Sequence, residues 1–241
     1  IVPSCEEVFH VAAAAERQGV ADRVFAPSLA VLRRLHSKIS FPALLTELGL
    51  NAPETFALER RVDVLALDIP PDQMVLKPEF SRFGTAVLVR PIAAQLAQWV
   101  GAGNDTLPTK WCAQRAVAGQ EICLWSAARG GRIVASCAYR PAWRHGASYA
   151  FEAIDCPAAL AVAERLAGAL NLTGQISLDI ILTPAGVAVP IECNPRSTSG
   201  VHLFDGAAAL ADAIIGAGPP VHCISGLRYL SPAMLVMGVA A

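Results

Sequence analysis

The residues best suited to chemistry lie within positions 174–200, GQISLDIILTPAGVAVPIECNPRSTSG. Alternating apolar residues on both sides of Pro-Ala-Gly at 184–186 predict two antiparallel strands joined by a turn. In such a hairpin Asp179 and Glu192 can lie side by side, and Asn194 shares a strand face with Glu192. Two carboxylates and an amide oxygen are hard ligands that suit Mg²⁺. The alternative is a solvated polar strand face, which we disfavour because a carboxylate in so apolar a strand is costly unless paired or metal-bound.

Two lysines and a glycine-containing loop are candidates for phosphate binding. Lys77 ends the apolar segment 74–78, which predicts a buried strand, and Lys38 is a second candidate cation. The loop from Ser81 to Thr85 follows, and its Gly84 allows backbone amides to approach a triphosphate closely. The alternative for Lys77 is a strand-end lysine whose stem lies along apolar surface. The combination with Gly84 and the acidic hairpin favours phosphate binding.

Composition and charge exclude several classes of protein. The 241 residues suit one large domain or two small ones, and 54% apolar residues provide ample core material. A net charge of −1 argues against a nucleic-acid partner. We find no uncharged apolar run of membrane-spanning length and no signal-peptide pattern, so we expect no membrane partner and a cytoplasmic location. Seven cysteines without a CxxC pair indicate reduced thiols and argue against zinc. No GxxxxGK[ST], GxGxxG or GxSxG motif is present.

The elements that must position these groups predict an α+β fold with largely antiparallel sheets. Helices are expected after the Ser4/Glu7 capping box up to Gly19 and at 29–35, 41–48, 92–100, 157–170 and 206–215. Strands are expected at 53–57, 74–78, 86–89, 110–117, 121–127 and 133–139, besides the acidic hairpin. Residues 141–148 are expected to form an irregular loop, and residues 218–241 have no clear assignment.

Four segments occur in a fixed order along the chain: HSKISFPALLTELGLNAPET, VLKPEFSRFG, QRAVAGQE and LDI…IECNPRSTSG. Each is weak alone, but the ordered set, which spans roughly 1–206, resembles the ATP-grasp superfamily. That superfamily includes D-alanine–D-alanine ligase, biotin carboxylase and carbamoyl-phosphate synthetase. The resemblance implies two α+β lobes with antiparallel sheets that clamp a nucleotide. It places the end of a preceding α/β domain at 1–30, an N-terminal lobe at 31–113, and a C-terminal lobe with the metal site and an extension at 114–241.

The resemblance also implies roles for individual residues. Nucleotide-binding positions would be Lys38, Lys77, Ser81, Gly84, Gln114, Arg115, Val117 and Glu121. Within this set, the segment from Gln114 to Val117 would hold the adenine, and Glu121 would hold the ribose hydroxyls. Gln114 departs from the family's usual glutamate, which removes a charge but keeps a carbonyl acceptor. The alternative for Glu121 is an exposed strand residue.

The metal set implied by the resemblance is Asp179, Glu192 and Asn194, with Mg²⁺ or Mn²⁺ bound. Arg196 would act with Lys77 in catalysis by steadying an acyl phosphate or carbonate intermediate. Arg140 and Arg144 stand in the expected loop at 141–148 or at its border, where an arginine fork could read a substrate carboxylate. Solvated arginines are an equally good interpretation of these two.

The function implied by this resemblance is an ATP- and Mg²⁺-dependent ligase. It would activate a carboxylate as an acyl phosphate for attack by an amine or another nucleophile, forming a C–N or C–S bond. The expected partners are small-molecule carboxylates and amines, and a homodimer is one candidate assembly. Two alternatives stay open: an enzyme that phosphorylates bicarbonate, as in a carboxylase or carbamoyl-phosphate synthetase, and a nucleotide-binding module without catalysis.

Overall fold

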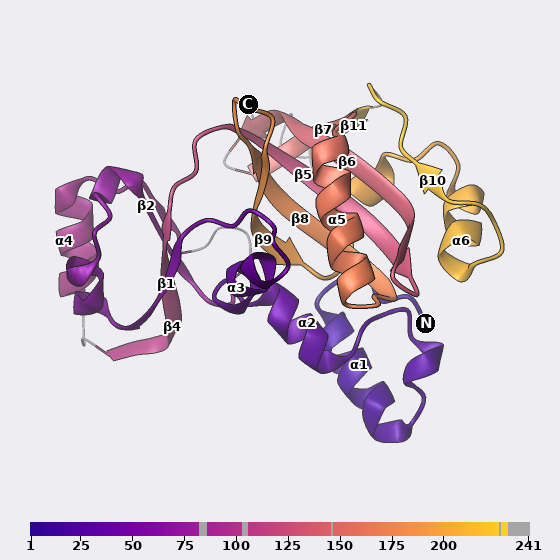
Figure 1. Ribbon diagram of the computed structural model, residues 1–241, viewed down its shortest axis with the longest axis horizontal. Coiled ribbons are helices and arrows are strands. Elements are labelled where there is room, and N and C mark those ends of the chain that lie inside the picture. The colour runs from indigo at the N-terminus through magenta and orange to yellow at the C-terminus, as the bar shows by residue number, and fades with distance from the viewer. Residues whose placement is uncertain (82–85, 103–105, 146, 227, 231–241) are drawn as a thin grey trace.

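The computed structural model describes residues 1–81, 86–102, 106–145, 147–226 and 228–230, with the backbone alone at 106, 108, 144, 145, 147, 149 and 230. Its strands form two sheets (Figure 1). The smaller sheet has the order β1-β4-β2-β3 and contains Thr55–Arg60, Met74–Pro78, Leu88–Val89 and Thr106–Arg115 as β1 to β4. All of its pairings are antiparallel.

The larger sheet has the order β11-β7-β6-β5-β8-β9, with β10 paired to β6. Its strands β5 to β11 are Gln120–Arg129, Arg132–His145, Ala147–Ile154, Gly174–Leu182, Ala188–Asn194, Val221–His222 and Arg228–Leu230. The short β10 runs parallel to β6, and the other pairings of this sheet are antiparallel. The predicted α+β class with largely antiparallel sheets is therefore confirmed.

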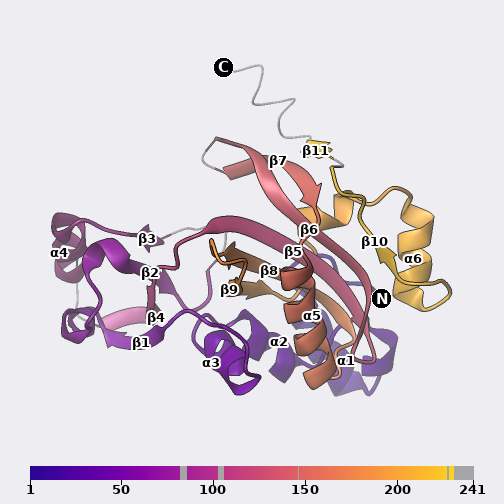
Figure 2. The same ribbon diagram turned by 45° about the horizontal axis from the view of Figure 1, so that its top comes forward.

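The described residues contain six α-helices. They are α1 Glu7–Gln18, α2 Leu29–His36, α3 Ser40–Glu47, α4 Ala93–Gly101, α5 Pro157–Ala169 and α6 Ala207–Ile215. The Ser28 hydroxyl caps α2 by accepting the Val31 N–H at 3.4 Å, and Gly19 ends α1 with a left-handed φ of 67°. Helix α5 crosses one face of the larger sheet, while α4 packs on the smaller sheet (Figures 1 and 2).

Period-two alternation divides the residues of the larger sheet between two cores. Leu178 and Ile180 of β8 face the core beneath α3 and α5, together with Ile122 and Leu124 of β5. Trp125 and Ala127 of β5 face the opposite core, which includes Leu210 of α6. Asp179 lies between Leu178 and Ile180 in β8, so its side chain is on the opposite face of the sheet from the core that these two residues fill.

Two regions differ from the sequence-based expectations. Residues 141–148 were expected to be irregular, but β6 continues to His145 and β7 begins at Ala147. The strand tolerates Pro141 because the β6–β7 register shifts between Pro141 and Trp143, which makes room for a residue that cannot donate a ladder hydrogen bond. The unassigned tail contributes β10 and β11 at edges of the larger sheet.

The described residues contain neither a membrane-spanning helix nor a disulfide. There, no helix combines the length and the apolar character needed to cross a membrane. The structure pairs none of the seven cysteines in a disulfide.

Candidate active site

A cavity of about 510 Å³ lies between the two sheets. The smaller sheet and the segments next to it contribute Val75, Lys77, Val87, Val89, Arg90, Gln114, Arg115, Ala116 and Val117. The larger sheet and its exit contribute Glu121, Asp179, Ile181, Ile191, Glu192, Asn194 and Arg196. The cavity therefore collects acids, bases and an amide from segments far apart in the sequence.

The predicted pairing of the two acids across the hairpin is confirmed. Asp179 of β8 is the register partner of Glu192 of β9, and Asn194 lines the same cavity two residues further on. The register then jumps from the Asp179–Glu192 pair to a pair of Ile180 with Pro190, so that Ile191 is the extra residue of a β-bulge. The bulge lets Ile191 and Glu192 both line the cavity, which strict alternation would not allow.

The acid pair is electrostatically unfavourable on its own. Burial, together with the neighbouring Glu192 carboxylate, raises the pKa of Asp179 from its ordinary 3.8 to about 6. The Cys123 thiol donates a weak hydrogen bond to Asp179 Oδ1 at 3.4 Å. Within the described residues, no cluster of three or more His, Cys, Asp or Glu side chains is placed to hold a metal. Both carboxylates and the Asn194 side chain line the same cavity.

Two buried lysines face these acids. Lys38 is only 2% exposed, and its Nζ lies 3.2 Å from Glu192 Oε1 and 3.3 Å from the carbonyl oxygen of Ser81. Lys77, 4% exposed, donates from Nζ to the carbonyl oxygen of Ile191 at 3.0 Å, which joins the smaller sheet to the larger one. Burial lowers the pKa of Lys77, and the Glu192 carboxylate opposes that effect.

The loop predicted to cover a phosphate lies mostly outside the described residues. Gly84 and Thr85 belong to the part of the chain that is left undescribed, and Ser81 is seen as the acceptor for Lys38. The backbone N–H of Lys38 also donates to the Glu79 carbonyl at 3.2 Å, so this strand exit and the α2–α3 turn are bonded to each other.

The segment predicted to hold adenine connects the two sheets. Gln114 is buried, and its Nε2 donates to Thr55 Oγ1 at 3.0 Å. Arg115 donates from Nε to Glu54 Oε2 at 2.7 Å and from a terminal nitrogen to the Asp68 carbonyl at 2.9 Å. Both residues line the cavity together with Ala116, Val117 and Glu121.

Gly119 fixes the path of this connection. Its φ is 157°, and a Cβ there would lie 2.3 Å from the carbonyl oxygen of Leu182. Only glycine allows the chain to pass so close to β8 before β5 begins.

Arg196 is held by a residue that the sequence did not single out. Its Nε donates to Glu6 Oε1 at 2.8 Å, and its terminal nitrogens donate to Asn194 Oδ1 and the Ser197 carbonyl. Glu6 lies 190 residues away in the chain, beside the start of α1, so no local pattern points to the pair. The N-terminal segment thus positions the guanidinium at the wall of the cavity.

His36 is a second residue that the sequence analysis missed. Its Nδ1 lies 3.3 Å from the carbonyl oxygen of Cys193, between Glu192 and Asn194, and its ring packs between Phe9 and Phe80. Burial lowers its pKa. The histidine therefore supports the backbone that carries the acidic and amide side chains.

Of the two arginines proposed to read a substrate, only Arg140 has a described side chain, and it pairs with an acid on the neighbouring strand. Arg140 donates from Nε, at 3.2 Å, and from a terminal nitrogen, at 2.9 Å, to the same Glu152 oxygen, Oε2, across the β6–β7 pair. Glu152 also accepts from Arg228 of β11 at 3.2 Å. Arg144 lies on β6, and its side chain falls outside the described atoms. Arg140 is not among the residues that line the cavity.

Comparison with known proteins places this architecture in a class. No family model matches the sequence, and no curated protein matches it. Solved structures do match, and they show that the chain has the ATP-grasp fold, which confirms the predicted fold class.

Three of these structures illustrate the likeness. Phosphoribosylamine–glycine ligase from Thermotoga maritima matches with a TM-score of 0.67 and 16% identity over 85% of this chain and 60% of that chain. N5-carboxyaminoimidazole synthase from Aspergillus clavatus, in complex with ADP and 5-aminoimidazole ribonucleotide, matches with a TM-score of 0.65 and 13% identity over 86% of this chain and 59% of that chain. The biotin carboxylase domain of Hydrogenobacter thermophilus 2-oxoglutarate carboxylase, with MgADP and bicarbonate, matches with a TM-score of 0.65 and 11% identity over 90% of this chain and 53% of that chain. The chain thus spans three fifths or less of the length of each of these three proteins.

Proposed function

We propose that this chain is the nucleotide-binding part of an ATP- and Mg²⁺-dependent ligase that activates a carboxylate for attack by an amine or another nucleophile. One observation carries the proposal: a buried lysine from the smaller sheet and a pair of facing carboxylates from the larger sheet line the same cavity. Phosphoryl transfer needs this combination of charges because anionic oxygens must be positioned and neutralised.

The donor set at the acid pair fits Mg²⁺. Two adjacent carboxylates, one with its pKa raised by the other and by burial, are stabilised when a divalent cation lies between them. Asp179, Glu192 and Asn194 would hold the ion, and Mg²⁺ would neutralise charge on the phosphate oxygens. Mn²⁺ has the same oxygen preference.

The remaining side chains have roles that follow from their chemistry. Lys38 and Lys77 would neutralise the phosphates, with Ser81 and Gly84 covering them. Arg196 would face the reacting carboxylate, since its guanidinium is already oriented by Glu6.

The base and sugar of ATP would occupy the segment between the sheets. The Gln114 amide nitrogen is bound to Thr55, which leaves its carbonyl oxygen to accept from the adenine amino group. Arg115 and Val117 would line the base, and Glu121 would bind the ribose hydroxyls.

In the reaction that we propose, a carboxylate oxygen attacks the γ-phosphorus of ATP and the bond to the ADP oxygen breaks. The amine then attacks the acyl carbon of the resulting acyl phosphate, inorganic phosphate leaves, and the amine loses a proton. The described side chains supply positioning and charge compensation for both steps and no covalent nucleophile. The division into lobes at 31–113 and 114–241, after an N-terminal remnant at 1–30, is part of the same proposal.

A second candidate is an enzyme that phosphorylates bicarbonate. It is favoured by the likeness to a biotin carboxylase domain that was solved with MgADP and bicarbonate. ADP release that depends on bicarbonate, without any added carboxylic acid or amine, would select this candidate.

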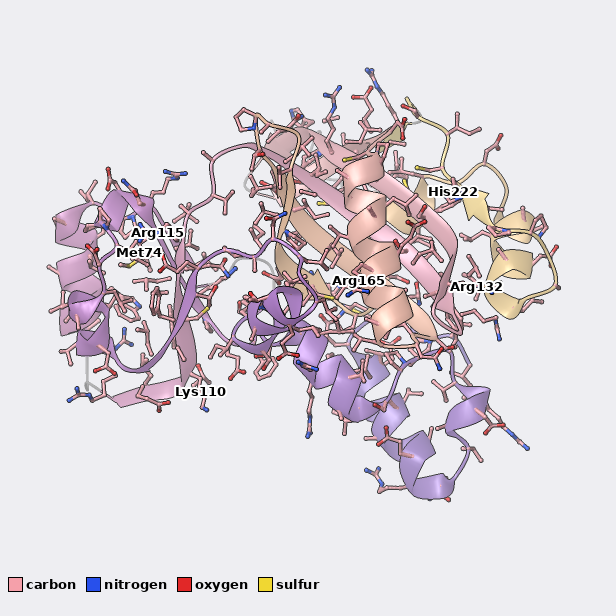
Figure 3. The ribbon with its side chains drawn as sticks, viewed as in Figure 1. Met74, Lys110, Arg115, Arg132, Arg165 and His222 are labelled. Atoms are coloured by element: carbon pink, nitrogen blue, oxygen red, sulfur yellow. The ribbon has the colours of Figure 1, made fainter. Side chains whose placement is uncertain are left out.

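The test is ADP release from ATP and Mg²⁺ over a panel of small carboxylates and amines, with Lys77→Met as the main variant. Its matched control is Lys110→Met, an exposed lysine on β4 of the same sheet that does not line the cavity (Figure 3). We expect Lys77→Met to raise the apparent KM for ATP at least about tenfold, because a charge-assisted phosphate contact is worth roughly 1.5–3 kcal/mol, and Lys110→Met to have no effect. Equal KM values in both variants would contradict the phosphate role. ATP binding without turnover across the panel and with bicarbonate would identify a non-catalytic nucleotide module.

A further inference from the structure

Strand β10 places a cysteine opposite another cysteine at the edge of the larger sheet. Val221 and His222 are the parallel register partners of Ala135 and Ser136, and the next residue on each strand is Cys223 and Cys137. The Cys223 N–H donates to the Ser136 carbonyl at 3.1 Å, which continues the pairing by one step. His222, labelled in Figure 3, marks the position of β10 beside the sheet.

The two thiols converge on one point. Cys137 Sγ lies 3.6 Å and Cys223 Sγ 3.9 Å from the same acceptor, the carbonyl oxygen of Ala138. Neighbouring strands lie about 5 Å apart, a spacing within the range of Cα separations that a disulfide spans. The strand pairing therefore places the two cysteines on neighbouring backbone positions that a disulfide can join.

The pair is asymmetric in access and in acidity. Cys137 is only 1% exposed, whereas Cys223 lines a cavity of about 360 Å³ that Ser136, Asp155 and Cys156 also line. The contact with Cys137 lowers the pKa of Cys223, while the contact with Cys223 and burial raise the pKa of Cys137. Cys223 is the sulfur that a reagent in the cavity can reach, and the thiolate is the nucleophile in thiol chemistry.

We propose that Cys137 and Cys223 form a modification site for hydroperoxides, with Cys223 as the attacking sulfur and Cys137 as the resolving sulfur. The Cys223 thiolate attacks the peroxide oxygen, the O–O bond breaks, and the Cys223 sulfenic acid forms while the other oxygen leaves as water or an alcohol. Cys137 sulfur then attacks the Cys223 sulfur, the S–O bond breaks, and water leaves with the Cys137 proton. Two thiols lose two electrons, which reduce one peroxide.

The disulfide links β10 to β6 and closes the chain between residues 137 and 223. It fixes the segment that follows α6 against the sheet and closes the cavity wall at Cys223. A bond that closes so long a loop restricts the unfolded chain strongly, so the oxidised protein should melt at a temperature higher by about 5–10 °C. A thiol reductant reverses the change, as expected for a cysteine pair that is free in the reduced protein.

Tryptic peptide mapping tests the proposal directly, because each relevant cysteine falls in a different peptide. Cleavage after arginine, with the bond before Pro141 left intact, gives 133–144 with Cys137, 145–165 with Cys156, and 197–228 with Cys223. We expect hydrogen peroxide to join 133–144 to 197–228, and dithiothreitol to release them. Cys156→Ser, the control from the same cavity, should leave this link unchanged, and Cys223→Ser should abolish it.

The wild-type protein alone is sufficient to refute the proposal. If Cys137 stays open to alkylation in denaturant after peroxide treatment, or if Cys223 becomes sulfinic acid without a link to Cys137, the two residues are not a disulfide-forming pair. A link between Cys223 and Cys156 instead would refute the assignment of Cys137 as the resolving sulfur.

Discussion

Replacing Asp179 by Asn should stabilise the metal-free protein at neutral and alkaline pH. Asn has nearly the same shape and can still accept the weak bond from Cys123, but it carries no charge. In the native protein the pKa of Asp179 is raised from 3.8 to about 6. Each pKa unit corresponds to about 1.4 kcal/mol, so ionising this carboxyl in the folded state costs about 2–3 kcal/mol above pH 6.

The stability contribution of Asp179 changes with pH because its carboxyl binds a proton more tightly in the folded state. Between about pH 4 and pH 6 the folded state holds the Asp179 proton more tightly than the unfolded state does. The contribution of this group to stability is therefore complete below about pH 4 and is lost as the pH rises through about 6. Asp179→Asn should match the wild type near pH 4 and exceed it by about 2–3 kcal/mol near pH 8.

Urea unfolding in EDTA, at several pH values between these limits, measures the difference. Asp212→Asn on α6, an exposed aspartate, is the matched control and should show no such trend. Saturating Mg²⁺ near pH 8 should reverse the order by stabilising the wild type, since the variant lacks one carboxylate of the proposed site. A wild-type advantage or a constant difference at all pH values in EDTA would refute the reasoning about Asp179.

Three further outcomes are expected. Gly200→Ala should lower stability by about 2–3 kcal/mol in urea unfolding, because its Cβ would lie 2.6 Å from Trp125 Cβ and 2.7 Å from a Tyr139 ring carbon; an unchanged midpoint would contradict this packing. Gly119→Ala should be comparably destabilising because of its φ of 157° and the close Leu182 carbonyl, whereas a neutral result would show that the connection can shift. Glu6→Gln should lower the free energy of unfolding by about 1 kcal/mol, since the ion pair with Arg196 is largely buried. A thermal scan that gives the same melting temperature for the variant and the wild type would contradict this prediction.

The acidic hairpin could be predicted because its signal is local. Alternation on both sides of the turn sets which residues face each other, and this places Asp179 beside Glu192 without knowledge of the rest of the fold. The bulge at Ile191 could not be predicted, because the same apolar letters fit a regular strand. The hydrogen bond from Lys77 to the main-chain carbonyl of Ile191 was likewise not expected, because it joins residues from different sheets.

Other features depend on contacts across the molecule. Pro141 and the glycine at 146 indicate a turn or loop in isolation, and the β6–β7 hairpin forms through the register shift that accommodates the proline. Strands β10 and β11 have two and three residues, too few for any periodicity to detect. The partnership of Glu6 with Arg196 arises only because the N-terminal segment packs against the exit of β9. The expectation of an irregular loop near Arg140 was wrong, because β6 extends to His145 and β7 begins at Ala147.

The smaller sheet is inserted in the chain between α3 and β5, and two neighbouring passages of the chain lead into it and out of it. The chain leaves the body formed by α1 to α3 and the larger sheet just before β1, and it returns just after β4. These two passages run side by side, since the Arg115 N–H donates to the Glu54 carbonyl at 2.8 Å. The exit of β2 is held as well, because the Lys38 N–H donates to the Glu79 carbonyl at 3.2 Å and the Lys38 ammonium to the Ser81 carbonyl at 3.3 Å. The ammonium of Lys77 adds a bond from the smaller sheet to the Ile191 carbonyl of the larger sheet, so an anion that competes for this ammonium would remove one of the contacts that hold the two sheets together.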